Sequence, residues 1–397
     1  MFLEILAACV LGILAGVFTG LFPGVHINLV AASLLALSPI LLEFLAPITL
    51  ASFLVAMAIT HTFLDTIPSI FLGVPEEETA LSILPGHELL LEGRGYEAVR
   101  LTAIGSLAAL FIILLISPLY IWLLPRYYPV MQNYMAFILL GAVGFLILRD
   151  EKKVFALFLF LLSGLLGIFT LNLTVINQPL LPLLSGLFGS SLLAISFIKK
   201  TKIPKQNFGV EDKVRGTGAA MFSSFISGSL VSFLPGLGAA QGAVIGSSFT
   251  KLSKKAFLIL LGAISTVTMG LGFTALFAIE KPRHGVAVAT GKILEYFTMN
   301  HLFLLFAVML LAGGLAFLLT IKIAEVFATK IYKVNYRKLS FVVIAVIILL
   351  CIFISGWLSL IVLVTGTGIG ILSSIFGVKK MHLMGCLILP VILYFLF

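Results

Sequence analysis

The stretch Gly20–Val30, GLFPGVHINLV, interrupts an apolar segment with a Pro-Gly pair that is followed by a histidine and an asparagine. A second stretch, Ser232–Gly242, reads SFLPGLGAAQG and has the same break in equally apolar surroundings. Proline removes a backbone hydrogen-bond donor and glycine weakens a helix, so each pair predicts a broken membrane helix. Lipid cannot satisfy the backbone groups that a break exposes, so they must face protein or a wet cavity.

The composition is that of a membrane protein. Of 397 residues, 61% are hydrophobic and 10% are charged, whereas a soluble domain is about half apolar and about a quarter charged. Long apolar runs follow one another, and each approaches the roughly 20 residues that a bilayer span requires. The sequence therefore predicts an all-α polytopic protein of the cell membrane. The net charge of +9 comes from Lys and Arg between the apolar runs, so we expect no nucleic-acid partner.

No catalytic or metal-binding pattern accompanies the apolar runs. The three cysteines, Cys9, Cys351 and Cys386, are far apart in apolar segments and lack the spacing of metal ligands. The stretch Gly285–Lys292, GVAVATGK, resembles a phosphate-binding loop, but its glycines are one residue too far apart and Ile293 follows the lysine. We expect neither an enzyme nor a bound cofactor or metal ion.

The two breaks belong to an internal repeat. Pro23 and Pro235 are 212 residues apart, and the same offset aligns two rows of small residues spaced four apart: Gly12, Gly16 and Gly20 in the first copy, and Ser224, Gly228 and Ser232 in the second. Rows of this kind let membrane helices pack closely. The chain is therefore predicted to consist of two related halves.

The positions of Lys and Arg orient these halves in opposite directions. Basic residues flank the second broken segment on both sides, from Lys199 to Arg215 and from Lys251 to Lys255, whereas the first carries only Glu4 and Glu43. Because basic loops face the cytoplasm, both ends of the second segment are predicted inside and both ends of the first outside, the N-terminus included. A segment of this length with both ends on one side must be a re-entrant hairpin.

The fold class that follows is two inverted-topology repeats, each a Pro-Gly re-entrant hairpin plus about five transmembrane helices. We place the first repeat at 1–198, a basic cytoplasmic linker at 199–215 and the second repeat at 216–397. Apolar runs predict spans near 45–64, 98–121, 130–149, 153–172 and 178–198 in the first half, and near 256–279, 301–321, 340–358, 361–377 and 381–397 in the second.

Inverted repeats with broken helices are typical of secondary transporters, whose substrate binds where the helices break. A helix that starts after a Pro-Gly pair directs the positive end of its dipole at that place, which suits an anion. The sequence predicts an ion-coupled transporter of small organic anions, and carboxylates are favoured. Its predicted binding residues are Pro23, Gly24, His26 and Asn28 at the first tip, and Pro235, Gly236, Gly238 and Gln241 at the second. The alternative to a binding site is that each Pro-Gly pair only kinks a packed helix.

Two further segments carry charge and proline in an apolar setting, 66–92 and 280–298. They are interpreted as second re-entrant elements, with short interfacial helices as the alternative. Ionisable groups at membrane depth are costly and mark substrate or ion pathways. The predicted polar lining, or route of a coupling proton or sodium ion, comprises Asp65, Glu76, Glu77, Glu78, Arg283 and His284, and His61 lies one helical turn before Asp65. The alternative for these charges is a solvated loop.

The chain resembles the TctA-like family, the large membrane subunit of tripartite tricarboxylate transporters, and in particular its shorter archaeal-type members. Five stretches carry the resemblance: the two Pro-Gly segments (12–39 and 232–255), LPGHELLLEGRGYEAVRLTAIGSLAA (84–109), PLLPLLSGLFGSSLLAISF (179–197) and SIFGVKKMHLMGCLILPVIL (374–393). The resemblance implies ion-driven carboxylate uptake together with a small membrane subunit and an extracytoplasmic binding protein. The triplet Glu76–Glu78 departs from the family pattern, because three acids repel a tricarboxylate unless they are protonated or ion-bound.

Other functions remain open from the residues alone. A translocase (flippase) of a polyprenyl-phosphate lipid carrier also uses duplicated Pro-Gly hairpins, and it requires an apolar lateral opening. A channel requires a continuous polar lining, whereas the polar positions here are scattered. A membrane enzyme requires a catalytic pair at one depth.

Overall fold

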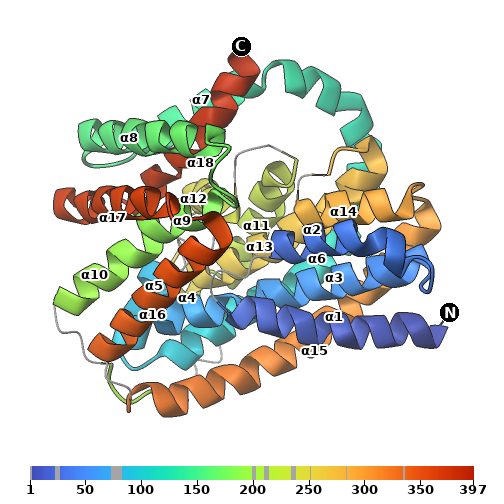
Figure 1. Ribbon diagram of the computed structural model, residues 1–397, viewed down its shortest axis with the longest axis horizontal. Coiled ribbons are helices and arrows are strands. Elements are labelled where there is room, and N and C mark those ends of the chain that lie inside the picture. The colour runs from blue at the N-terminus through green and yellow to red at the C-terminus, as the bar shows by residue number, and fades with distance from the viewer. Residues whose placement is uncertain are drawn as a thin grey trace.

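The computed structural model describes residues 2–22, 27–72, 83–198, 203–209, 214–233, 238–250, 252–282, 284–333 and 336–397. These residues form a helical bundle without any β-strand in the described ranges (Figure 1). The all-α prediction is therefore confirmed.

The helices of the first half follow the predicted apolar runs. They are α1 (Phe2–Leu21), α2 (Ile27–Leu41), α3 (Pro47–Leu64), α4 (Thr66–Leu72), α5 (Ile83–Leu91), α6 (Gly95–Asn133), α7 (Met135–Leu148), α8 (Lys153–Asn172), α9 (Leu180–Leu184), a π-helix η1 (Ser185–Ser190) and α10 (Ser191–Ile198).

The second half repeats much of this order. Its helices are α11 (Thr217–Val231), α12 (Ala239–Phe249), α13 (Lys254–Ile279), α14 (Gly285–Leu294), α15 (Met299–Ile331), α16 (Tyr336–Leu350), a π-helix η2 (Cys351–Ser355), α17 (Ser359–Phe376), a 3-10 helix η3 (Lys380–Met384) and α18 (Gly385–Leu396).

Seven helices of the described chain are long and apolar enough to cross a bilayer: α1, α3 together with α4, α6, α8, α13, α15 and α17. This finding supports the predicted multi-pass membrane protein. The remaining predicted spans correspond to shorter apolar helices, α7, α9–α10, α16 and α18. The predicted re-entrant hairpins, the inverted orientation and the external N-terminus stay predictions. α1 is one arm of the first predicted hairpin, and its 20 residues are the length of a full bilayer span.

Two predicted spans are longer in the structure than in the sequence reading. α6 continues to Asn133 although it contains Pro118, Pro125 and Pro129, and α15 continues to Ile331. A proline inside a helix removes one hydrogen bond and bends the helix without necessarily ending it. Figure 1 shows the last part of α6 arching away from the bundle before α7 begins.

The centre of the bundle is formed by α3 and α13, which are the most enclosed of the long helices. The two halves use them in the same way: α1 packs along α3 and α11 along α13, while α15 lies on α3 and α6 on α13. The small-residue rows produce this packing. A Cβ atom added at Gly16 would lie 2.6 Å from the Met57 carbonyl oxygen, and one added at Gly228 would lie 2.8 Å from the Val267 side chain.

The arms of the two broken segments pack differently. α12 lies directly on α11, because Gly242 and Gly246 leave room for Val231 and Ser227. Over the described residues, α2 packs instead on α3 and α14, and an apolar cavity of about 340 Å³ lies between α1, α2 and α3.

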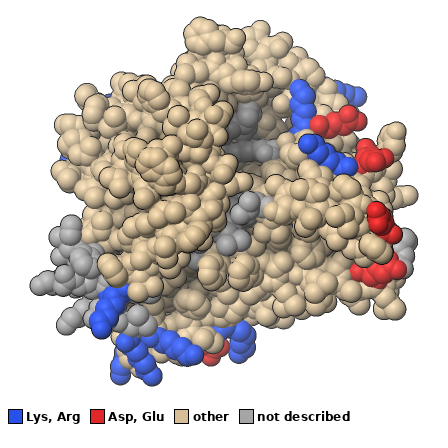
Figure 2. Space-filling model, in the orientation of Figure 1, with Lys and Arg blue, Asp and Glu red and all other residues tan. Residues whose placement is uncertain are grey.

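The buried apolar residues divide the helices into two groups. The first group is built around α1–α6 and α13–α15, and the second around α7–α10 and α16–α18. Figure 2 shows the surface hollowed where the two groups face each other. The arms of the second broken segment contact both groups, because Ala243 of α12 belongs to a core of the first and Val231 of α11 to a core of the second.

Basic residues between the helices form contacts between segments that are far apart in the sequence. Lys152 Nζ donates a hydrogen bond of 2.7 Å to the Phe376 carbonyl, which joins the α7–α8 loop to the end of α17. Lys205 of the linker lies over the Tyr332 ring at the end of α15. On the face drawn in Figure 2, one group of Lys and Arg lies at the lower left, a second lies at the upper right, and Asp and Glu lie mostly along the right side.

Candidate functional site

The described part of the chain includes only some of the predicted site residues. Asn28, Asp65, Gly238 and His284 are described, and so is the backbone of Gln241 within α12. The others lie outside the described residues: Pro23, Gly24, His26, Glu76, Glu77, Glu78, Pro235, Gly236 and Arg283. The site is therefore built from the residues that flank the two breaks.

Two helices begin together next to the first break. Asn28 is the second residue of α2 and Gly285 the first residue of α14, and a Cβ atom added at Gly285 would lie 2.9 Å from Asn28 Oδ1. α2 and α14 then run side by side (Figure 1). Each helix start has backbone N–H groups without a partner inside its own helix, so both halves of the chain contribute donors here.

His284 precedes the first residue of α14 and has extended backbone. Its ring is part-buried, and Nε2 lies 3.1 Å from the carbonyl oxygen of Thr268 on α13. A carbonyl can only accept, so Nε2 carries the proton and donates this bond. Gly272 allows the close approach, because a Cβ atom there would lie 2.9 Å from His284 Cδ2. The segment 280–298 thus brings a histidine close to Asn28, because His284 directly precedes Gly285.

His61 of α3 lies on the other side of the first break and is 2% exposed. Its Nδ1 lies 3.1 Å from the hydroxyl oxygen of Thr19, near the end of α1. The Thr19 hydroxyl donates to the Gly16 carbonyl, so it accepts from His61, and Nδ1 is the protonated nitrogen.

Asp65 ends α3 one helical turn after His61 and is 1% exposed. Its backbone lies against Gly20, where an added Cβ atom would be 3.2 Å from the Asp65 nitrogen. Ser69 donates a 2.8 Å hydrogen bond to the Asp65 carbonyl and so ties this corner to α4. The Asp65 side chain is therefore enclosed by the fold, and its predicted role in a polar lining or ion route stays a prediction.

 Gly20 is three residues before Pro23 in the sequence. The contact with Gly20 therefore places Asp65 at the end of α1, next to the first break.

Together these side chains surround the described ends of the first break. Asn28 and His284 lie where α2 and α14 begin, and His61 and Asp65 lie against the last turn of α1. An amide, two imidazoles and a carboxylate are thereby supplied from both halves of the chain. This set can donate hydrogen bonds to an anion and can hold or release a proton.

The second break is flanked by a tyrosine that the sequence reading missed. The Tyr120 hydroxyl of α6 is hydrogen-bonded to the Ser232 hydroxyl and lies 2.7 Å from the Ser229 carbonyl, both at the end of α11. Gly238, just before α12, is buried, and its predicted role in substrate binding stays a prediction. A tyrosine within an apolar span needs a partner for its hydroxyl group, which is the signal that could have found it.

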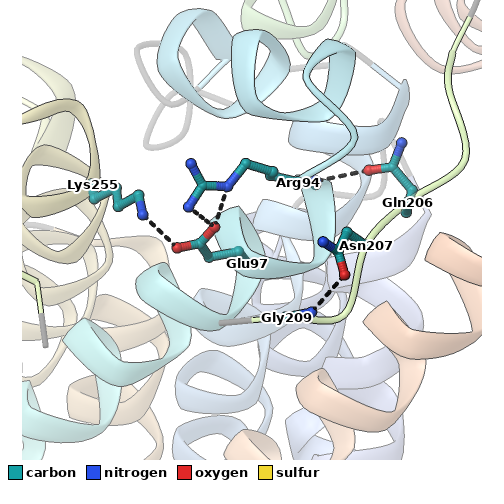
Figure 3. Close-up of polar contacts among 7 residues, drawn as sticks. Arg94, Glu97, Gln206, Asn207, Gly209 and Lys255 are labelled. Carbon is teal, nitrogen blue, oxygen red and sulfur yellow. Dashed lines mark hydrogen bonds and ion pairs between the residues drawn. The ribbon is translucent and has the colours of Figure 1, made fainter. Parts of the chain in front are cut away.

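A buried ionic cluster lies where α6 begins (Figure 3). The Glu97 carboxylate is fully buried and pairs with Arg94, 2.7 Å away, and with Lys255 of α13, 2.9 Å away. Beside it, Gln206 of the linker accepts a 2.8 Å hydrogen bond from the Gly95 nitrogen and donates to the Leu90 carbonyl. The cluster joins the two halves and the linker, so it is a structural junction.

Comparison with known proteins assigns the chain to a family. The sequence profile described as "Tripartite tricarboxylate transporter TctA family" matches residues 6–385. The chain belongs to the TctA family. It is also 31% identical over 398 residues to the uncharacterized protein MJ1079 of Methanocaldococcus jannaschii, and the match covers 98% of each chain. No solved structure matches the chain.

Membership of the TctA family confirms the resemblance found in the sequence. TctA proteins are the large membrane components of tripartite transporters, which work with a binding protein and a small subunit. The resembling segments occupy the features described above. Segment 12–39 forms α1 and α2, 84–109 holds the ionic cluster, 179–197 forms α9 to α10, 232–255 holds the second break and α12, and 374–393 forms η3 and most of α18.

Proposed function

We propose that this TctA-family chain is an ion-coupled secondary transporter of small organic anions, and specifically of carboxylates, which bind between the tips of the two broken segments. The observation that carries this proposal is the contact of Asn28 with Gly285, because it sets two helix starts from the two halves side by side.

The chemistry of that contact suits a carboxylate. A helix start has partial positive charge and free N–H donors, and it stabilises a negative group within about one turn. The Asn28 amide and the His284 ring add side-chain donors at the same place. In the second half, α12 begins at Ala239, four residues after Pro235 in the sequence.

Asp65 and His61 are the proposed coupling groups. An ionised Asp65 would repel an arriving carboxylate, and a proton or a sodium ion bound at Asp65 would remove that repulsion. Binding of the ion and of the anion would then favour each other, which is the coupling that uptake against a gradient requires. The low exposure of both side chains, 1% for Asp65 and 2% for His61, supports this role because exposed groups would be screened by water.

Alternating access would follow from movement between the two helix groups. Each group has its own apolar core, and the arms of the second broken segment contact both. Secondary transporters expose a site to either side by moving one such group against the other. In the proposed system, a binding protein would deliver the carboxylate from outside and a small membrane subunit would complete the transporter.

The test is the thermal stability of purified protein against a panel of mono-, di- and tricarboxylates and polyprenyl phosphates, with and without sodium and at two pH values. A ligand that binds only the folded state raises the unfolding midpoint. We expect a carboxylate to raise it, more so with the coupling ion, and Asn28→Ala to abolish the shift. Asn172→Ala, at the exposed end of α8, is the matched control and should keep the shift.

A shift that occurs only with polyprenyl phosphates would contradict the proposal and favour a lipid-carrier translocase. A carboxylate shift that survives in Asn28→Ala would leave transport in place but would overturn the assigned binding site.

A further inference from the structure

Lys380 is a buried cation in a place where the sequence suggests an exposed loop. It is the first residue of η3, between α17 and α18, and only 7% exposed, whereas its neighbour Lys379 is exposed. Its Nζ donates a hydrogen bond of 2.9 Å to the hydroxyl oxygen of Ser191, the first residue of α10. The contact links a lysine of the second half to a serine of the first.

No acidic side chain of the described chain pairs with Lys380. Other buried charges of the described residues have an opposite charge beside them: Lys255 is paired with Glu97, and His382, two residues after Lys380, is paired with Asp150. An ammonium group has three N–H donors, and the bond to Ser191 uses one of them. Burial of a cation without an opposite charge costs several kcal/mol, so such a group is retained for a reason other than packing.

The residue next to Ser191 in the sequence is a second buried serine. Ser190 ends the π-helix η1, is 4% exposed, and its hydroxyl has no hydrogen-bond partner among the described residues. α17 approaches this turn closely at Gly370, where an added Cβ atom would lie 2.1 Å from the Leu187 carbonyl oxygen. π-helical turns occur frequently at functional sites because they displace backbone and side chains from the regular helix pattern.

The segments that meet here are two of the five that carry the family resemblance, 179–197 and 374–393. They belong to the second helix group, whereas Asn28 and Gly285 belong to the first. The core that includes Leu383 and Met384 also includes Val231 of α11, next to the second break. Lys380 therefore lies in the part of the fold that the second broken segment contacts.

We propose that Lys380, together with Ser190 and Ser191, binds a carboxylate group of the transported anion. This inference rests on the proposed function and adds a second point of attachment for the substrate, in the other helix group. The carboxylate would accept hydrogen bonds from the two remaining Lys380 N–H groups and from Ser190, and it would supply the missing opposite charge. An anion with two or more carboxylates would fit best, because one group can bind at the helix starts and another at Lys380.

The test compares Lys380→Met with Lys379→Met, which removes the same charge from the exposed neighbouring position. In the absence of ligand, we expect Lys380→Met to unfold at the wild-type temperature or above it. Methionine has a similar length but no charge, so the variant avoids the cost of burying an ammonium group. With di- and tricarboxylates at constant ionic strength, the midpoint shift should require about tenfold more ligand or more. Lys379→Met should respond as the wild type does, and Lys380→Arg should keep most of the response.

The remaining outcomes distinguish the inference about Lys380 from the proposed function. A strongly lowered midpoint in unliganded Lys380→Met, restored in Lys380→Arg, would show a structural role and overturn the inference. A carboxylate shift that is lost in Asn28→Ala but unchanged in Lys380→Met would also overturn it while the proposed function stands. A shift lost in Lys380→Met but kept in Asn28→Ala would support the Lys380 site and move substrate binding away from the first break. A wild-type protein that no carboxylate stabilises would overturn both.

Discussion

Thr62 and Thr266 are 204 residues apart in the chain, and their hydroxyl oxygens lie 3.0 Å apart where α3 crosses α13. The Thr62 hydroxyl already donates to the Ile59 carbonyl, 2.9 Å away, so the proton in the shared bond belongs to Thr266. Both side chains are fully buried. This polar contact joins the central helices of the two halves, and its direction is fixed by the backbone of α3.

Because Thr266 is the donor, replacing Thr62 and replacing Thr266 should have different effects on the free energy of unfolding. Thr62→Val leaves the Thr266 hydroxyl buried without its acceptor and should lower the free energy of unfolding by about 1–3 kcal/mol. Thr266→Val leaves Thr62 bonded to Ile59 and should cost less, and the double variant should be more stable than Thr62→Val. Denaturation of the purified protein in detergent measures all three, and a larger loss for Thr266→Val than for Thr62→Val would contradict the assignment.

The packing of α1 on α3 predicts a strong effect at Gly16. A Cβ atom there would lie 2.6 Å from both the Met57 carbonyl oxygen and Thr60 Cβ, so Gly16→Ala must push the two helices apart. Overpacking of this kind costs about 1–3 kcal/mol. Gly144→Ala is the control, because nothing lies within 4 Å of its Cβ position in α7. It should be neutral or gain up to about 1 kcal/mol in thermal stability, and equal losses at both positions would argue against the described contact.

Gly285 offers a way to disturb Asn28 without changing it. A methyl group at Gly285 would displace the Asn28 amide, so Gly285→Ala should weaken carboxylate binding as Asn28→Ala does. Because both changes act on one contact, the double variant should bind little worse than either single variant. Gly291→Ala lies on the same helix against the flexible Leu276 side chain and should leave binding unchanged. Fully additive losses in a ligand titration would show that the two residues act separately.

The Asp150–His382 pair gives stability a defined dependence on pH. Burial raises the pKa of Asp150, but the Lys152 N–H group, the hydrogen bond with His382 and the positive charges of His382 and Lys379 together hold it below its usual value. A carboxyl whose pKa is lower in the folded state stabilises the protein above its unfolded pKa of about 3.9, and that contribution is lost as the pH falls through the folded pKa. Asp150→Asn should therefore be less stable than the wild type at neutral pH.

The difference between Asp150→Asn and the wild type should shrink as the pH drops below about 4. Thermal unfolding at a series of pH values measures it, with Glu151→Gln, an exposed neighbour, as the control. A difference that grows on acidification would contradict the sign of the pKa shift.

The helices could be predicted from the sequence because apolar length and small-residue spacing are local signals. The rows at Gly16 and Gly228 predicted which helix faces pack closely. The sequence also differs between the two broken segments at the positions where α12 packs on α11. The repeat offset of 212 aligns Gly242 and Gly246 with Val30 and Leu34, so the first copy lacks the two glycines that leave room for α11 beside α12.

The sequence did not reveal contacts that depend on how the chain turns. Lys380 follows Lys379 in what reads as a basic loop, and only the turn of η3 buries one of the two side chains and exposes the other. Glu97 reads as an ordinary residue at a helix start, but the approach of α13 encloses it. Asn28 and His284 were chosen for their neighbours in the sequence, and their meeting across 256 residues, from 28 to 284, depends on the packing of α14 against α2.

The linker between the halves has a consequence for how the gene can be divided. Gln206 bonds to both ends of the turn between α5 and α6, and the Asn207 nitrogen donates to the Gly93 carbonyl at 2.7 Å. Ile203 is buried as well. A cut in the linker would disturb these hydrogen bonds between the linker and the α5–α6 turn. The midpoint of the chain is therefore a poor site for splitting the protein or for inserting a reporter domain. The α8–α9 turn around Asn172 and Leu173, whose side chains are exposed, is the better place for such an insertion.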